Sequence, residues 1–128
     1  MKMKKLKPTE SELEILQILW KCGASSVRFV NDELNKNKQV GYTTSLKIMQ
    51  IMADKNLVSR IKDGRTHIYS AAIEQKDTQN QLLKKLVDGV FAGSAKNLVM
   101  QALGNHEASK SELEEIRKFI NDLEEEKS

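Results

Sequence analysis

The dipeptide Asp63-Gly64 separates two short arms, residues 57–62 and 65–70, in which apolar and polar residues alternate. This alternation is typical of β-strands, and Asp-Gly between two such arms predicts a tight β-hairpin. Three apolar side chains of the arms are expected to face or flank the core: Val58, Ile61 and Ile68. The fold must therefore place a small β-element beside whatever the preceding residues form.

The first helix is expected from a capping box, in which Thr9 and Glu12 each reach a free amide of the first turn. It should stop at Gly23, because glycine suits the left-handed C-terminal cap. The helix is expected to run through the apolar residues Leu13, Leu16, Ile18, Leu19 and Trp20. We expect Trp20 to anchor the core and Cys22 to be a small, buried apolar group.

Two more helices should follow before the hairpin. One begins at Ser25 or Ser26 and ends in the polar run 35–38, and the other spans residues 41–55, with Asn56 able to take a positive φ at its cap. The side chains expected to point inward from the second helix are Val27, Phe29, Val30 and Leu34. Two helices joined this tightly match a helix-turn-helix.

The third helix has a distinctive polar face. At helical spacing three of its apolar residues fall on one side: Leu46, Met49 and Ala53. Hydroxyl, amine and amide groups crowd a neighbouring side: Thr43, Thr44, Lys47 and Gln50. Hydroxyls contact phosphates and bases, lysine binds guanine acceptors, and glutamine pairs with adenine, so this face suits a DNA major groove. The alternative is a solvated face that reads nothing.

The tip of the predicted hairpin is basic. Lys62 and Arg65 flank the turn, and Thr66 follows them. A hairpin with a cationic tip directly after a helix-turn-helix is typical of the wing of a winged helix. Ser26, at a helix N-terminus, would offer its hydroxyl and the adjacent amides to a phosphate. An ordinary surface hairpin is less favoured, because the charge is concentrated at the turn.

Charge divides the chain in two. Residues 1–73 contain thirteen Lys and Arg against seven Asp and Glu, whereas residues 74–128 contain eight against eleven. We expect residues 1–73 to form a winged-helix DNA-binding domain and residues 74–128 a helical dimerisation region, in a mainly α fold with a small β-hairpin wing.

The apolar stripes of the second region, residues 74–128, need a partner surface, and a second copy of the chain is the simplest one. Its candidate dimerisation residues are Leu82, Leu86, Val90, Leu98, Leu113, Ile116, Ile120 and Leu123. Packing back onto the N-terminal domain is the alternative.

Other classes of protein find little support. No apolar run is long enough to cross a membrane, so no membrane insertion is expected, and a single cysteine suits a cytoplasmic protein. His67 and His106 stand alone. Because metal-ligand spacing, a glycine-rich phosphate loop and a nucleophile motif are all missing from the sequence, we expect no enzyme, no metal and no cofactor.

Three motifs in this order resemble the penicillinase-repressor family of BlaI/MecI-like regulators. They are Ser-Glu-Leu-Glu-Ile-Leu-Gln-Ile-Leu-Trp at 11–20, Gly-Tyr-Thr-Thr at 41–44, and Lys-Asp-Gly-Arg at 62–65 with Tyr69 following. The resemblance spans nearly the whole chain. It implies a homodimeric winged-helix repressor that occupies a pseudo-palindromic DNA operator, with dimer contacts in the C-terminal helices.

At two features of the family this sequence differs from the family pattern. Members paired with a membrane-bound peptidase sensor are cut at an Asn-Phe bond in the C-terminal region, and the matching bond here is Gln101–Ala102. A copper-responsive branch uses cysteine pairs in this region, which holds none here. The resemblance implies a repressor in a sensor-linked operon, such as one for beta-lactam resistance. The alternative is a winged-helix module that binds protein and reads no DNA sequence.

Overall fold

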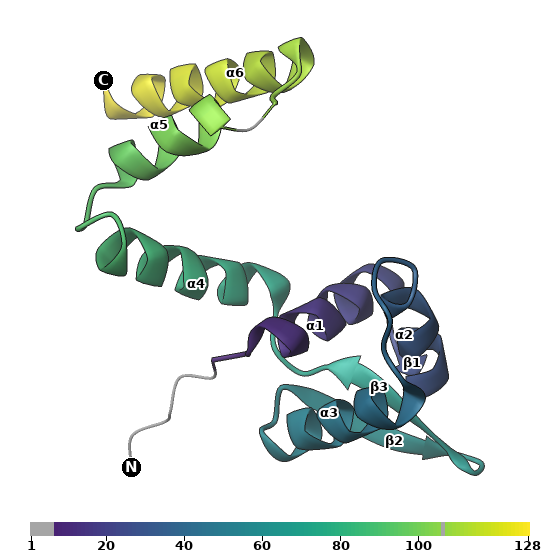
Figure 1. The fold of residues 1–128 in the computed structure, drawn as a ribbon. Coiled ribbons are helices and arrows are strands. Elements are labelled where there is room, and N and C mark those ends of the chain that lie inside the picture. The colour runs from purple at the N-terminus through teal and green to yellow at the C-terminus, as the bar shows by residue number, and fades with distance from the viewer. Residues whose placement is uncertain (1–6, 106) are drawn as a thin grey trace, which may run out of the picture. The chain divides into compact units, whose positions relative to one another are not determined.

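The computed structural model describes residues 7–105 and 107–128, so His106 lies outside the described residues. The elements follow in the order α1 (Glu10–Cys22), β1 (Ser25–Ser26), α2 (Val27–Leu34), α3 (Tyr42–Asp54), β2 (Val58–Asp63), β3 (Thr66–Ala71), α4 (Gln75–Gly89), α5 (Ala95–Asn105) and α6 (Lys110–Lys127) (Figure 1). Contacts divide the chain into two compact units between Asn80 and Gln81. The first unit has the helices and the hairpin that the sequence predicts for a winged helix.

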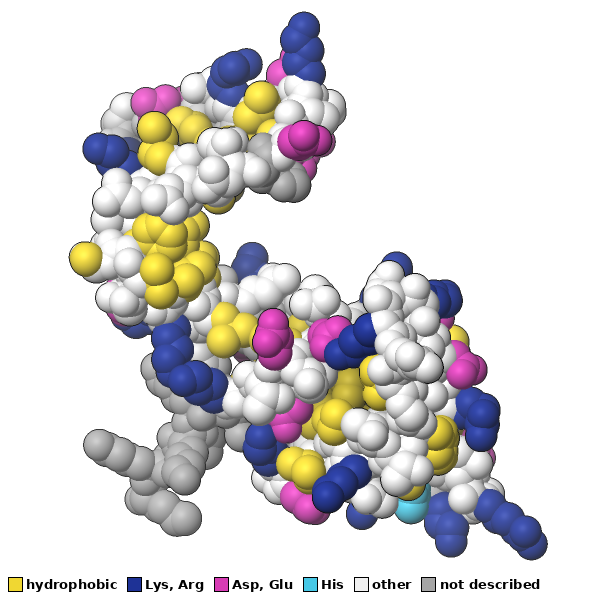
Figure 2. All heavy atoms as spheres, viewed as in Figure 1, with side chains coloured by type: hydrophobic (Ala, Val, Ile, Leu, Met, Phe, Trp, Pro, Cys, Tyr) yellow, Lys and Arg dark blue, Asp and Glu magenta, His cyan; other side chains and the backbone are white. Residues whose placement is uncertain are grey.

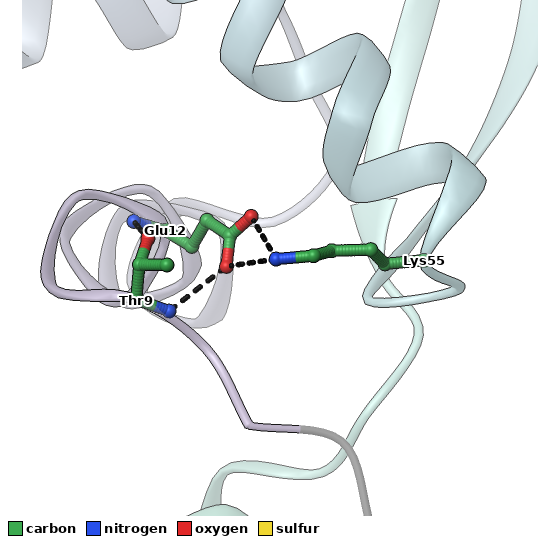
Figure 3. A network of polar contacts seen from close by, with 3 residues as sticks. All are labelled: Thr9, Glu12 and Lys55. Atoms are coloured by element: carbon green, nitrogen blue, oxygen red, sulfur yellow. Dashed lines mark hydrogen bonds and ion pairs between the residues drawn. The ribbon is translucent and has the colours of Figure 1, made fainter. Parts of the chain in front are cut away.

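Helix α1 is fixed at both ends by the predicted caps. The Glu12 amide donates to Thr9 Oγ1 at 3.2 Å, and the Thr9 amide donates to Glu12 Oε1 at 2.8 Å. Gly23 ends the helix with φ 83°, a conformation that glycine adopts without strain. The Glu12 carboxylate also accepts two hydrogen bonds from Lys55 Nζ, at 3.0 and 2.9 Å (Figure 3). One side chain thereby caps α1 and ties it to the end of α3.

This buried carboxylate makes stability depend on pH. Burial raises the pKa of Glu12, but the Thr9 amide and the Lys55 ammonium favour the ionised form more, so its pKa lies below 4.5. A lowered pKa in the folded state stabilises the fold above 4.5, and the stabilisation is lost as pH falls through the folded-state value. Urea unfolding at a series of pH values should show this loss of stability. In Glu12→Gln the part of the pH dependence that comes from Glu12 should be absent. An identical pH dependence in Glu12→Gln would contradict this role.

A buried polar contact joins α2 to α3. Ser45 is completely buried, and its Oγ lies 2.7 Å from the side-chain amide of Asn31. With the amide nitrogen turned toward it, Asn31 donates to Ser45 and also lies 3.2 and 3.3 Å from the carbonyls of Val40 and Gly41. Asn31 therefore fixes both α3 and the loop that leads into it.

The sheet has three antiparallel strands in the order β1-β3-β2. The two-residue strand β1 was not predicted, because its pairing joins residues far apart in sequence: Ser25 with Tyr69, and Ser26 with Ile68. Ser26 is also the N-cap of α2, and its Oγ accepts from the Phe29 amide at 3.1 Å. The start of α2 is thus attached directly to the hairpin.

The hairpin turn lies one residue later than predicted. Asp63 pairs with Thr66, which leaves Gly64 and Arg65 as the turn residues. Gly64 has φ 65° at the first turn position, where a type II′ turn requires glycine. The sequence signal had instead placed the turn at Asp63-Gly64. Arg65 therefore lies at the very tip of the wing.

The core of the first unit is formed by all three helices and the hairpin. Its buried apolar residues are Ile15, Leu16, Leu19, Val27, Val30, Leu34, Met49, Met52, Leu57, Val58 and Tyr69. Trp20 packs against this cluster, as predicted, and its Nε1 donates to the Ile73 carbonyl at 3.0 Å. Asn56 takes φ 64° after α3, which confirms the predicted cap.

Three predictions of burial were wrong. Phe29 is 41% exposed, because the inward stripe of α2 runs through Val27 and Val30 and leaves Phe29 on another side. Ile61 is 68% exposed, since its odd spacing from Val58 puts the two on opposite faces of β2. Cys22 ends α1 and lines a surface groove of about 370 Å³ instead of the core.

None of the described residues of the second unit is buried, so they form no apolar core of their own. After Tyr69, Thr78 is the only buried residue in the described part of the chain. Helix α4 ends at Gly89, so Val90 lies just beyond the helix. Helix α5 ends at Asn105. Hydrophobic side chains lie on the surface of these helices (Figure 2).

Candidate nucleic-acid interface

The predicted reading face of α3 is open to solvent. All four of its residues are exposed: Thr43, Thr44, Lys47 and Gln50. The helix is held from the opposite side, where Ser45, Met49 and Met52 are completely buried. Thr43 and Lys47 are four residues apart, and Lys47 and Gln50 three, so their side chains are neighbours on the helix surface. The structure thus presents this polar face on a helix fixed in the core.

The start of α3 also offers backbone donors. Its N-cap is Gly41, which has no side chain to accept a hydrogen bond from the first-turn amides. Uncapped amides at a helix N-terminus favour an anion. The end of the helix nearest Thr43 is therefore suited to a phosphate.

The wing contributes the second part of the surface. Lys62, Arg65 and Thr66 are all exposed, and Lys62 pairs with His67 across the hairpin. Figure 2 shows Lys and Arg side chains gathered around the hairpin tip. No ion pair involves Lys62 or Arg65 among residues 7–105 and 107–128. These charges are available to a polyanion.

A hollow of about 440 Å³ lies between the wing and helices α2 and α3. Its lining residues are Ser26, Val27, Arg28, Tyr42, Leu46, Arg65, Thr66, His67 and Tyr69. Three predicted DNA-binding residues are therefore brought together here, namely Ser26, Arg65 and Thr66. The other five lie outside the hollow: Thr43, Thr44, Lys47, Gln50 and Lys62. Arg28, Tyr42 and His67 were missed, because nothing in the sequence places α2, α3 and β3 around one hollow.

The described residues contain neither a candidate metal site nor a candidate membrane-spanning helix. No cluster of three or more His, Cys, Asp or Glu side chains in this part of the chain is placed to hold a metal ion. No helix within it is long and apolar enough to cross a bilayer.

Comparison with known proteins decides the family. Residues 8–122 match the profile of the penicillinase repressor family. The chain belongs to the penicillinase repressor family. It is 25% identical to the penicillinase repressor of Staphylococcus aureus over 120 residues, which cover 94% of this chain and 95% of that protein. It is 35% identical to the transcriptional regulator BlaI of Mycobacterium tuberculosis over 60 residues, 46% of this chain and 44% of that protein.

Solved structures of the family agree with the fold. The DNA-binding domain of the repressor BlaI superposes with a TM-score of 0.52 at 26% identity, covering 59% of this chain and 93% of that domain. A monomeric form of Bacillus licheniformis BlaI, solved in complex with the blaP half-operator, has the same fold at a TM-score of 0.50 and 24% identity, covering 58% and 90%. The chain is a winged-helix, DNA-binding transcriptional repressor, and its family is not a class of enzymes.

Proposed function

We propose that this repressor acts as a homodimer on a pseudo-palindromic DNA operator and reads base sequence with the polar face of α3. The observation that carries the proposal is that this face is exposed on a helix whose other side is fixed in the core. In this arrangement Thr43, Lys47 and Gln50 reach base edges, and Thr44 reaches a base or a nearby phosphate. Two copies would place their α3 helices about one or two turns of B-DNA apart.

Phosphate contacts hold this reading helix in register. Ser26, Lys62, Arg65 and Thr66 are the residues that we assign to the DNA backbone. Ser26 lies at the N-terminus of α2, and Arg65 occupies the tip of the hairpin, where no carboxylate within the described residues pairs with it. Such contacts strengthen binding to every sequence and make it dependent on salt.

Arg65→Ala should therefore weaken binding to cognate and scrambled duplexes by the same factor. Removing one phosphate contact should also lower the slope of log affinity against log salt by about 0.9 for each bound copy. Fluorescence anisotropy at several salt concentrations measures both quantities. A loss confined to the cognate duplex would show instead that Arg65 reads a base.

The dimer is assigned to residues 74–128, and the winged helix to residues 1–73. None of the eight candidate dimerisation residues is buried within one chain, although all are apolar: Leu82, Leu86, Val90, Leu98, Leu113, Ile116, Ile120 and Leu123. Val90 is 70% exposed and Ile120 47%. Apolar surface of this extent on three successive helices is best explained by a second copy that covers it.

Sedimentation of the full chain, alone and with operator DNA, tests the dimer. Wild type should have the mass of two chains, and two chains should bind each operator. Ile120→Asp places a charge in the apolar surface, so this variant should sediment as one chain. It should bind the full operator no more tightly than a single half-site. Asn121→Asp adds the same charge at a neighbouring exposed position and should remain dimeric. A monomeric wild type would overturn the proposal.

Release from DNA is the remaining assignment. We place the repressor in the cytoplasm and propose that it controls an operon linked to a sensor. A membrane-bound peptidase sensor would then lead to cleavage of the Gln101–Ala102 bond. Both residues are exposed, but the bond lies inside α5, so cleavage requires local unwinding. A cut here would detach α6 and half of the proposed dimer surface. Mass spectrometry of the protein from induced cells tests this, and an intact chain would exclude proteolytic release.

A further inference from the structure

The hollow between α2, α3 and β3 has a basic rim and an apolar floor. Arg28 comes from α2, Arg65 from the hairpin turn and His67 from β3, and none of the lining residues is acidic. The floor is formed by Val27, Leu46 and Tyr69, of which Tyr69 is completely buried. Two guanidinium groups thus face one cavity without a carboxylate to neutralise them.

Arg28 is held in place by α3. Its guanidinium carbon lies 5.1 Å from the centroid of the Tyr42 ring, within the range of a cation–π interaction. A cation–π contact does not use the guanidinium N–H groups as hydrogen-bond donors, so they can still donate to an anion. In the part of the chain that the structure describes, no carboxylate pairs with Arg28. Arg28 is therefore a positioned cation whose hydrogen-bonding capacity is unused.

We propose that this hollow binds one phosphate of the DNA backbone and that Arg28 is its principal ligand. The inference rests on the proposed function and adds a contact to it. The guanidinium fork matches two phosphate oxygens, and Arg65 supplies a second positive charge. Ser26 Oγ accepts a hydrogen bond from the Phe29 amide at 3.1 Å, yet it keeps its own O–H to donate.

The position of this phosphate explains how α3 is set in the groove. Tyr42, which holds Arg28, is the first residue of α3 and directly precedes Thr43 on the reading face. A phosphate fixed beside Tyr42 would define the depth and register at which the following turns of α3 meet the bases. Arg28 and Tyr42 are thus positioning residues for sequence recognition.

The test uses operator duplexes in which a single phosphate is replaced by a neutral methylphosphonate, one position at a time. Wild type should lose affinity on the order of tenfold at one linkage of each half-site. Arg28→Gln should lose a similar factor on unmodified DNA and show no further loss at that linkage. Its salt slope should fall by about 0.9 for each bound copy, whereas Arg28→Lys should keep the slope and lose part of the affinity.

Lys21→Gln is the matched control, because it removes one exposed positive charge at the end of α1, outside this hollow. It should keep the wild-type pattern of sensitive linkages. The phosphate site is overturned if Arg28→Gln remains sensitive at every linkage that affects wild type. If wild type fails to prefer its operator over scrambled DNA, the proposed function fails instead, and the salt slopes of Arg28→Gln and Lys21→Gln still decide the phosphate site.

Discussion

Tyr69→Ala should lower the free energy of unfolding by about 3–5 kcal/mol, as for other large aromatic side chains removed from a core. Tyr69 lies on the central strand β3, is completely buried, and is paired with Ser25 on β1 and with Arg60 on β2. Its loss would leave a cavity where the sheet meets the helices. Urea unfolding followed by circular dichroism measures the change.

Tyr69→Phe separates the ring from the hydroxyl. The hydroxyl accepts one long hydrogen bond, from the Arg60 guanidinium at 3.5 Å, so its removal should cost about 1 kcal/mol or less. Because Tyr69 is part of the core, Tyr69→Ala should also reduce DNA binding by lowering the fraction of folded protein. A Tyr69→Ala protein as stable as wild type would contradict the position of this ring in the core.

Lys47→Ala and Gln50→Ala should each cost about 1–3 kcal/mol per half-site on the cognate operator. Each should also relax discrimination at one base position, because a bidentate contact from lysine to guanine or from glutamine to adenine specifies that base. A panel of duplexes with single base-pair changes measures this as a loss of affinity differences at one position. In a dimer the cost should appear at both half-sites.

Gln17→Ala is the matched control for Gln50→Ala, since Gln17 is an exposed glutamine within a helix, on α1 instead of α3. It should bind every duplex in the panel as wild type does. If Gln50→Ala lost the same affinity on every sequence, Gln50 would be a backbone contact and not a base reader.

Elements with local signals were predictable from the sequence. The capping box at Thr9, the stop at Gly23 and the positive φ of Asn56 each depend on a few neighbouring residues, and all three are present. The turn was misplaced by one residue because Asp-Gly and Gly-Arg both contain the glycine that a two-residue turn needs. Ile61 shows the same limit, since alternation fixes two faces but does not say which is covered.

The candidate site divides in the same way. The polar face of α3 could be read from helical spacing alone, and the exposure of Thr43, Lys47 and Gln50 agrees with it. The hollow could not be predicted from the sequence. Arg28, Tyr42 and His67 line it together because the pairing of β1 with β3 attaches α2 to the hairpin. Arg28 carries no signal in the sequence beyond its charge. Its role depends on the ring across from it.

The most direct test of the reading face is the affinity of the wild-type chain for DNA upstream of its own coding sequence and for a scrambled duplex of the same composition. Fluorescence anisotropy at several salt concentrations, with mass measured in parallel, gives affinity, salt dependence and stoichiometry. We expect two chains to bind the upstream DNA at least a thousandfold or so more tightly than the scrambled duplex at physiological salt. Equal, weak binding to both, fading together with salt, would contradict sequence reading by α3 and favour a winged-helix module that binds protein.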